Sequence, residues 1–174
     1  FPFGVMPQES QGQLAGSAIT GWDMSASGLA AVWATENTRE SIMDAFKRRE
    51  VYSTTGPRMS LRVFGGYDFS AADAQVRNVA AIGYQKGVPM GSDLAPLTVS
   101  ERKAPQLLIK ANKDPEGAGL DRVQVVKGWL AADGSTKERV FDVSWAGDRV
   151  IANGKLASIG DTVNRKTGKL DSDL

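Results

Sequence analysis

Apolar and polar residues follow two different periodicities along this chain. The pattern is helical in one segment near the beginning and strand-like over most of the rest. A compact apolar run at 28–34 is typical of a buried strand. Segment 37–50 has apolar residues three and four apart, which indicates a helix, and 51–53 returns to a strand pattern. Strands joined through a helix are usually parallel neighbours, so this order predicts a short βαβ unit.

The helix at 37–50 has sequence signals at both ends. Asn37 is placed to cap its first turn, and Glu40 three residues later completes a capping box. The inward face is expected to contain Ile42, Ala45, Phe46 and Arg49, and the face in water Lys47, Arg48 and Glu50. Cations at 47–49 complement the negative end of the helix dipole, which we favour over a binding patch.

From residue 59 onward the pattern predicts strands and gives no helix signal. Residues 59–64 alternate and stop at a Gly pair, 75–82 form a weak strand pattern, and 106–111 form a strong one. Two Gly and a Pro make 84–93 a predicted loop. A further strand is expected around 155–159.

A β-hairpin is the clearest single prediction of the second half. Segments 120–130 and 137–145 flank a turn that contains Asp133 and Gly134, a favoured pair where the backbone takes positive φ. Six large apolar residues are expected to pack one side of the hairpin against a second sheet: Val123, Val125, Trp129, Phe141, Val143 and Trp145. This pattern predicts an antiparallel β-sandwich.

The N-terminal region gives weaker signals. Residues 1–6 are apolar enough for a short buried strand, whereas 7–27 are rich in Gln, Gly and Ser and are expected to form a loop. The chain does not begin with Met, which suggests a start inside a larger protein.

The composition limits the chemistry that the chain can perform more than it limits the fold class. The 174 residues are 41% hydrophobic, carry a net charge of +1 and contain no His and no Cys. Thiolate catalysis, Cys or His metal sites and Ser-His-Asp triads are therefore excluded within this chain. The near-zero charge does not imply a nucleic-acid partner, and no apolar stretch is long enough for a membrane span.

The best candidate for a binding site follows the strand at 51–53. Thr54, Thr55 and Arg58 come at its end, where α/β proteins commonly place ligand sites, and an Arg beside two hydroxyls suits a phosphate or carboxylate. The alternative is structural: the threonines satisfy turn backbone and Arg58 pairs with a carboxylate across a domain junction.

Two further groups have structural interpretations that we favour. Asn112, Asp114, Glu116 and Asp121 offer oxygen ligands for calcium, but they lack EF-hand spacing and suit a solvated turn. The tryptophans of the hairpin, at 129 and 145, have faces that stack on sugars or bases, but their strand positions predict core roles first.

Several segments carry a resemblance to a known family. They are 27–40, 51–58, 64–69, 87–94, 113–118 and 120–129. Together they resemble the C-terminal part of a bacterial family, domain of unknown function 3604, which is itself similar to PHP-type (polymerase and histidinol phosphatase) metal-dependent hydrolases. The likeness covers nearly the whole chain.

The resemblance implies an α+β fold made of two parts. Residues 1–58 would be the incomplete C-terminal end of a PHP-like α/β barrel, and 59–174 a mainly antiparallel β-sandwich-like domain without its last strand. The family's His-containing metal motif is expected after a strand like 3–6, but 7–10 hold no such ligand. Either residues are missing between Met6 and Pro7, or the chain is a divergent piece.

The implied function is that of a fragment of a metal-dependent, phosphoesterase-like hydrolase that is not catalytically complete by itself. A divalent zinc, manganese or iron ion would be held by other parts of the same polypeptide, which are its expected partners together with a small phosphate- or ester-bearing substrate. The family's habits favour a periplasmic or secreted location. The alternative is a non-catalytic β-sandwich module that recognises a carbohydrate or a protein.

Overall fold

The computed structural model describes most of the chain and gives it a mostly antiparallel architecture. The described residues are 12–14, 17–19, 28–98, 103–159, 164 and 166–168. Strands β1 (Gly12–Leu14) and β2 (Ser17–Ile19) pair antiparallel within the segment expected to be loop, which corrects that prediction there. The strand predicted at 1–6 lies outside the described residues.

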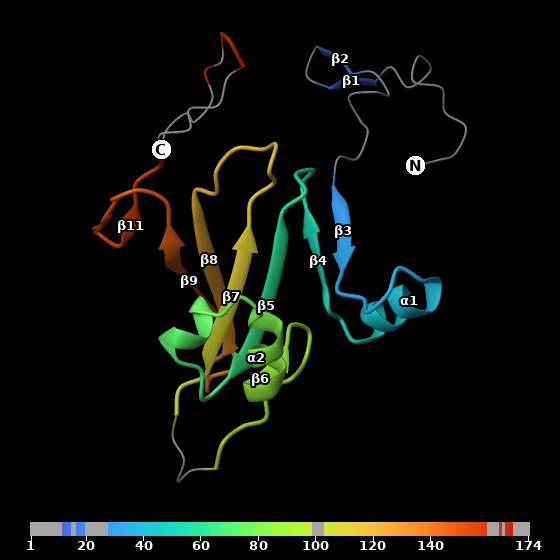
Figure 1. The fold of residues 1–174 in the computed structure, drawn as a ribbon. Coiled ribbons are helices and arrows are strands. Elements are labelled where there is room, and N and C mark those ends of the chain that lie inside the picture. The colour runs from blue at the N-terminus through green and yellow to red at the C-terminus, as the bar shows by residue number, and fades with distance from the viewer. Residues whose placement is uncertain are drawn as a thin grey trace.

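The predicted parallel βαβ unit is wrong. Strand β3 (Leu29–Val32) and strand β4 (Val51–Thr54) are antiparallel, with helix α1 (Arg39–Lys47) between them. Figure 1 shows α1 beyond one end of the strand pair, so it does not run back along it. Arg49 takes a φ of 61° at the helix end, and the chain therefore enters β4 at the end where β3 finished.

Helix α1 begins one residue later than the capping prediction. Thr38, rather than Asn37, is the N-cap, and its hydroxyl accepts a hydrogen bond from the Ser41 amide. Ala45 is fully buried as expected, whereas Phe46 is 45% exposed. Glu50, expected in water, is only 2% exposed, because the turn after the helix directs it inward.

A three-stranded antiparallel sheet forms the centre of the molecule. Its order is β6 (Gly87–Pro89), β5 (Ser60–Gly66) and β7 (Gln106–Asn112). This confirms the predicted strands at 59–64 and 106–111, and it places β6 inside the predicted loop at 84–93.

Two helical elements cover one face of this sheet, although the sequence pattern predicted none after residue 59. They are the 3-10 helix η1 (Ala71–Gln75) and helix α2 (Val79–Lys86). Asn78 caps α2 by accepting a hydrogen bond from the Ala81 amide. Gly83 lies against the ring of Phe64, where an added Cβ would be 2.4 Å from ring atoms. The predicted weak strand at 75–82 is therefore wrong.

A small hydrophobic core cluster lies between α2 and the sheet. It consists of Phe64, Phe69, Val79 and Leu108, each 8% exposed or less. Burying a large apolar side chain contributes roughly 1.5–3 kcal/mol, so this cluster fixes α2 on the sheet.

The predicted hairpin is confirmed, but its packing is different. Strands β8 (Arg122–Leu130) and β9 (Thr136–Trp145) pair around a turn in which Gly134 has a φ of 80°. A bulge between Val123 and Gln124 shifts the register, so Trp145 pairs with Arg122 and leaves the face of Phe141. The six apolar residues thus share no single face, and three are 37–48% exposed: Trp129, Phe141 and Val143.

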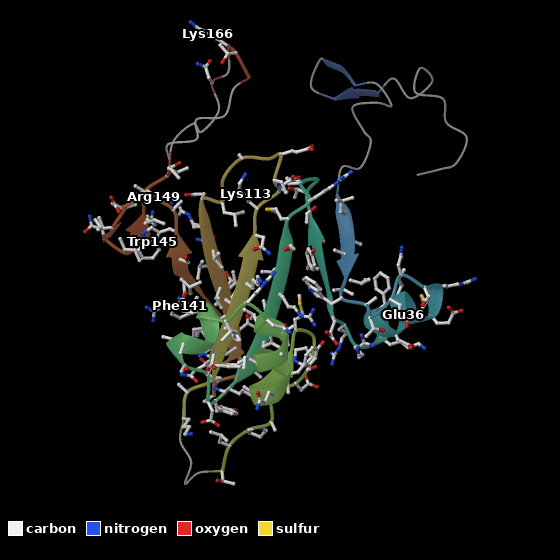
Figure 2. All side chains as sticks on the ribbon, viewed as in Figure 1. Glu36, Lys113, Phe141, Trp145, Arg149 and Lys166 are labelled. Carbon is white, nitrogen blue, oxygen red and sulfur yellow. The ribbon has the colours of Figure 1, made fainter. Side chains whose placement is uncertain are left out.

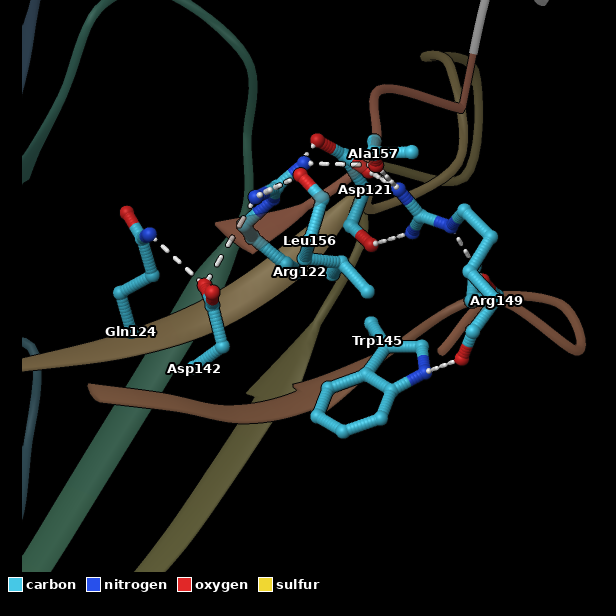
Figure 3. Close-up of polar contacts among 9 residues, drawn as sticks. Asp121, Arg122, Gln124, Asp142, Trp145, Arg149, Leu156 and Ala157 are labelled. Atoms are coloured by element: carbon cyan, nitrogen blue, oxygen red, sulfur yellow. Dashed lines mark hydrogen bonds and ion pairs between the residues drawn. The ribbon is translucent and has the colours of Figure 1, made fainter. Parts of the chain in front are cut away.

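A smaller hairpin follows β8–β9 in the chain. Strands β10 (Ile151–Ala152) and β11 (Lys155–Leu156) overlap the strand expected around 155–159. Two arginines fasten this hairpin to the end of β8–β9 (Figure 3), since Arg122 and Arg149 both donate to the carbonyl oxygen of Ala157. The described residues thus form an α+β arrangement of antiparallel sheets without a closed barrel.

Candidate anion-binding site

A buried carboxylate lies where α1, β4 and the central sheet meet. Glu50 Oε1 accepts a hydrogen bond from Arg48 Nε at 2.9 Å, and Oε2 accepts one from the Tyr84 hydroxyl at 2.5 Å. Arg62 Nη2 is 3.5 Å from the same Oε2. A buried charge is tolerated only when it is paired in this way, so Glu50 and its partners act as one unit.

Arg62, on β5, is the central cation of this unit. Its guanidinium carbon lies 4.4 Å from the ring centre of Trp33, and Nη2 donates to the Tyr84 hydroxyl at 2.8 Å. The Trp33 indole is itself fixed by a hydrogen bond to the Leu61 carbonyl oxygen. The Arg62 side chain is 17% exposed, and within the described part of the chain its Nε is buried without a hydrogen-bond partner.

Arg62 also lines a pocket of about 170 Å³ that opens between α2 and the central sheet. Its lining residues are Trp33, Ser60, Arg62, Arg77, Asn78, Val79, Ala80, Lys110 and Asn112. Sheet register explains the grouping on the strands: Ser60 is paired with Asn112 and Arg62 with Lys110, so all four residues are on one face. The first turn of α2 contributes the opposite wall.

The pocket is strongly cationic. Three of its lining residues are Arg62, Arg77 and Lys110, and the lining contains no Asp or Glu. Arg77 and Lys110 are exposed, and neither has an acidic partner within 4.0 Å among the residues the structure describes. The positive end of the α2 dipole adds to the same potential.

Tyr84 stays a neutral hydrogen-bond donor in this arrangement. Burial raises the pKa of its hydroxyl above the usual value, and the hydrogen bond to Glu50 raises it further. The neutral hydroxyl therefore bridges the Glu50 carboxylate and the Arg62 guanidinium, and it holds the guanidinium against Trp33.

This geometry suits the recognition of an anionic group. Arg binds carboxylate and phosphate oxygens through parallel N–H bonds, and Lys adds a point charge. The volume is below the roughly 300–1,000 Å³ of pockets for drug-sized ligands. The pocket thus fits one anionic group or a small anion better than a whole cofactor.

Potential metal ligands are scattered among the residues that the structure describes. No group of three or more His, Cys, Asp or Glu side chains converges among them. The carboxylates of the turn considered for calcium are engaged elsewhere: Asp114 accepts the amides of Arg58 and Glu116, and Asp121 is paired with Arg122 and Arg149.

Thr54 is the last residue of β4, and Thr55 and Arg58 lie in the turn that leads to β5. None of the three is among the pocket-lining residues. Thr54 Oγ1 accepts a hydrogen bond from the Gly56 amide at 3.3 Å. The Arg58 amide donates to Asp114 Oδ2 at 2.6 Å, which depresses the pKa of that carboxyl below its usual value. These contacts define the turn, and ligand binding by the three side chains stays a prediction.

Sequence reasoning missed the cationic pocket. Arg62 and Lys110 alternate with apolar residues in two strands, a pattern that resembles an ordinary solvent-facing side. Only the pairing of β5 with β7 puts them opposite each other, and only the unexpected helix α2 brings Arg77 to the same place.

Comparison with known proteins gives one informative match. No curated protein and no solved structure matched the chain. In the described ranges, no helix has the length and apolarity needed to cross a lipid bilayer. The sequence model of a family described as protein of unknown function (DUF3604) matches residues 4–174. The match covers nearly the whole chain, and the protein belongs to the DUF3604 family.

Proposed function

We propose that this chain binds a small anionic group, of the phosphate or carboxylate kind, in the pocket formed by Arg62, Arg77 and Lys110. The observation that carries the proposal is the convergence of three cations on one pocket whose lining contains no Asp or Glu. Arg binds phosphate and carboxylate oxygens through charge-assisted hydrogen bonds, and exposed Lys adds a point charge.

The wider proposal is that the chain is one portion of a PHP-like, metal-dependent hydrolase of phosphate or related esters. In this view residues 1–58 are the incomplete C-terminal end of a catalytic barrel, and residues 59–174 form an appended sandwich-like domain. The zinc, manganese or iron ion would be held by other residues of a longer polypeptide. The cationic pocket supports this proposal, since a substrate of that class carries the anionic group it fits.

Phosphate titration followed by amide NMR tests the pocket. We expect inorganic phosphate to shift the amide signals of Asn78, Val79 and Ala80, which lie in the pocket wall. Arg77→Gln and Lys110→Gln should each weaken binding about fivefold, because each removes an exposed cation of the pocket. Lys155→Gln is the matched control, since Lys155 is exposed and lies on β11. Equal weakening by the control variant would contradict a defined site.

The turn residues have their own test within the hydrolase proposal. In a polypeptide that shows ester hydrolysis, Arg58→Ala should reduce turnover well beyond any loss of stability, while Thr54→Val and Thr55→Val reduce substrate affinity. Unchanged kinetics in all three variants would leave these residues with only their structural role in the turn.

A second candidate function is that of a non-catalytic binding module. It is favoured by Trp129, whose side chain is 43% exposed on the β8–β9 hairpin instead of packed in a core. Trp is enriched at interfaces because its ring is apolar and its indole N–H is polar.

A further inference from the structure

We infer that the outer half of the β8–β9 hairpin is a binding surface for an acidic oligosaccharide. The surface, here called the cationic face, consists of Lys127, Trp129, Lys137, Arg139 and Phe141. Figure 2 shows Phe141 on this hairpin, apart from Arg149, which lies beyond the end of β9. The proposal rests on the second candidate function, that of a binding module, and is independent of the anion pocket, with which it shares no residue.

Sheet register puts these five side chains on one side of the hairpin. Trp129 is paired with Lys137, Lys127 with Arg139, and Val125 with Phe141. Paired residues share a face and residues two apart along a strand return to it, so the three pairs form consecutive rows. A row of two cations thus lies between two rows that each contain an aromatic ring.

Charge is segregated between the two sides of the hairpin. The cationic face has three positive residues and no acidic one, whereas Glu138 and Asp142 belong to the opposite side by the same register. Lys127, Lys137 and Arg139 are exposed, and no acidic group lies within ion-pair distance of them in the described part of the chain.

The aromatic rings are accessible beside these charges. Trp129 is 43% and Phe141 37% exposed. Lys127 Nζ lies 5.5 Å from the Trp129 ring centre, and the Arg139 guanidinium carbon 4.9 Å from that of Phe141. The two aromatic rows are four residues apart along the strands, or about 13–14 Å. An elongated ligand with several rings and several negative groups would match this spacing.

An acidic oligosaccharide has the required chemistry. The C–H faces of its sugars stack on aromatic rings, and its carboxylates or sulfates pair with Lys and Arg. Nucleic acid also combines rings with negative charge, but its binding depends on an extended positive field. The chain has a net charge of only +1, so the localised cationic face favours the oligosaccharide.

Affinity measurements at low salt with three probes test this inference. They are a short oligogalacturonate, a neutral malto-oligosaccharide of equal length and a short thymidine oligonucleotide. We expect the oligogalacturonate to bind at least tenfold more tightly than the other two. The triple variant Lys127→Gln/Lys137→Gln/Arg139→Gln should weaken it at least tenfold, and Trp129→Ala about fivefold.

A charge-matched control distinguishes the effect of the cationic face from the effect of the net charge. Arg39→Gln/Lys155→Gln/Lys166→Gln removes three exposed cations elsewhere and should leave the affinity within twofold of the original. Equal weakening by this control, or tighter binding of the oligonucleotide, would overturn the inference. Thermal unfolding of each variant verifies that it is folded, and Arg77→Gln/Lys110→Gln should leave oligogalacturonate binding unchanged even if the anion pocket proposal fails.

Discussion

Arg62 on β5 and Lys110 on β7 are directly paired across the central sheet. Like charges at such a position normally destabilise a sheet. Here Arg62 is held by Tyr84, Trp33 and the buried Glu50, while Lys110 stays exposed at the other side of the pocket. This pairing concentrates positive charge where an anion can lie between the two side chains.

Glu50→Gln should lower stability and raise anion affinity at the same time. The substitution leaves Arg62 without its buried counter-ion, a change that typically costs about 3–5 kcal/mol for a fully buried pair. The side chain of Arg48, the other partner of Glu50, is 46% exposed, so water can solvate it after the substitution. We therefore expect the free energy of unfolding to fall by roughly 2–3 kcal/mol. Loss of the competing carboxylate should make phosphate bind several-fold more tightly.

Urea unfolding and a phosphate titration of the Glu50→Gln variant measure the two effects separately. Weaker phosphate binding in a folded variant would show that Glu50 supports the pocket instead of competing with its ligand. Asp44→Asn is the control, because Asp44 is an exposed carboxylate on α1 that pairs with Lys47 and makes no contact with Glu50 that the described residues show.

Tyr84→Phe should destabilise the protein by about 1–3 kcal/mol, because Glu50 then loses its closest hydrogen-bond donor while remaining buried. Tyr52→Phe removes a neutral hydrogen bond to the Met59 carbonyl and should cost only about 0.5–1.5 kcal/mol. Chemical denaturation of the two variants gives the comparison, and equal losses would argue against a special role for the buried carboxylate.

Gly83→Ala should destabilise the fold even though Ala is usually the better helix former. An added methyl would meet the Phe64 ring at 2.4 Å, and overpacking of this kind typically costs about 1–3 kcal/mol. In Gly128→Ala the nearest atom would be 3.9 Å away, so this variant is the matched control. A Gly83→Ala protein that is as stable as the original would contradict the packing of α2 on the sheet.

Acid should weaken the attachment of η1 to α2. The Lys86 ammonium, which donates to Asp73, and the Ser70 amide hold the pKa of the Asp73 carboxyl below its usual value. Because the folded pKa is lowered, this stabilisation is complete above the ordinary Asp pKa of about 3.9 and disappears as pH falls through and below it.

Melting temperatures measured across the acidic range should therefore fall less steeply in Asp73→Asn than in the original protein. Asp133→Asn is not a suitable control because the Asp133 carboxyl also has a lowered pKa. Asp148 is an exposed residue of the turn after β9, and Asp148→Asn should leave the slope unchanged. Parallel curves for Asp73→Asn and the original would contradict the assigned role.

Elements with local signals were predictable from the sequence. The hairpin could be read from alternation around Asp133 and Gly134, and the strand at 106–111 from its apolar run. Helix α2 could not, because Gly83 looks like a helix breaker until Phe64 is known to lie against it. The direction of β4 depended on the reversal at Arg49, whose left-handed backbone has no sequence signal.

The candidate site was less predictable than the fold because its residues converge from four separate segments. Thr54, Thr55 and Arg58 are neighbours in sequence and were therefore visible, whereas Arg62, Arg77 and Lys110 meet only through strand pairing and helix packing. The sequence pattern predicts Glu50 on the solvent side only if the helix continues past Lys47, where it ends. Its burial depends on tertiary contacts with Arg62 and Tyr84, which lie far from it in sequence.

The dissociation constant of inorganic phosphate for the double variant Arg77→Gln/Lys110→Gln tests the central claim most directly. Both residues are exposed, so the variant should fold as the original does. The account predicts at least tenfold weaker binding than in the original protein, with no change in the melting temperature measured without phosphate. Unchanged phosphate affinity in the folded double variant would contradict it.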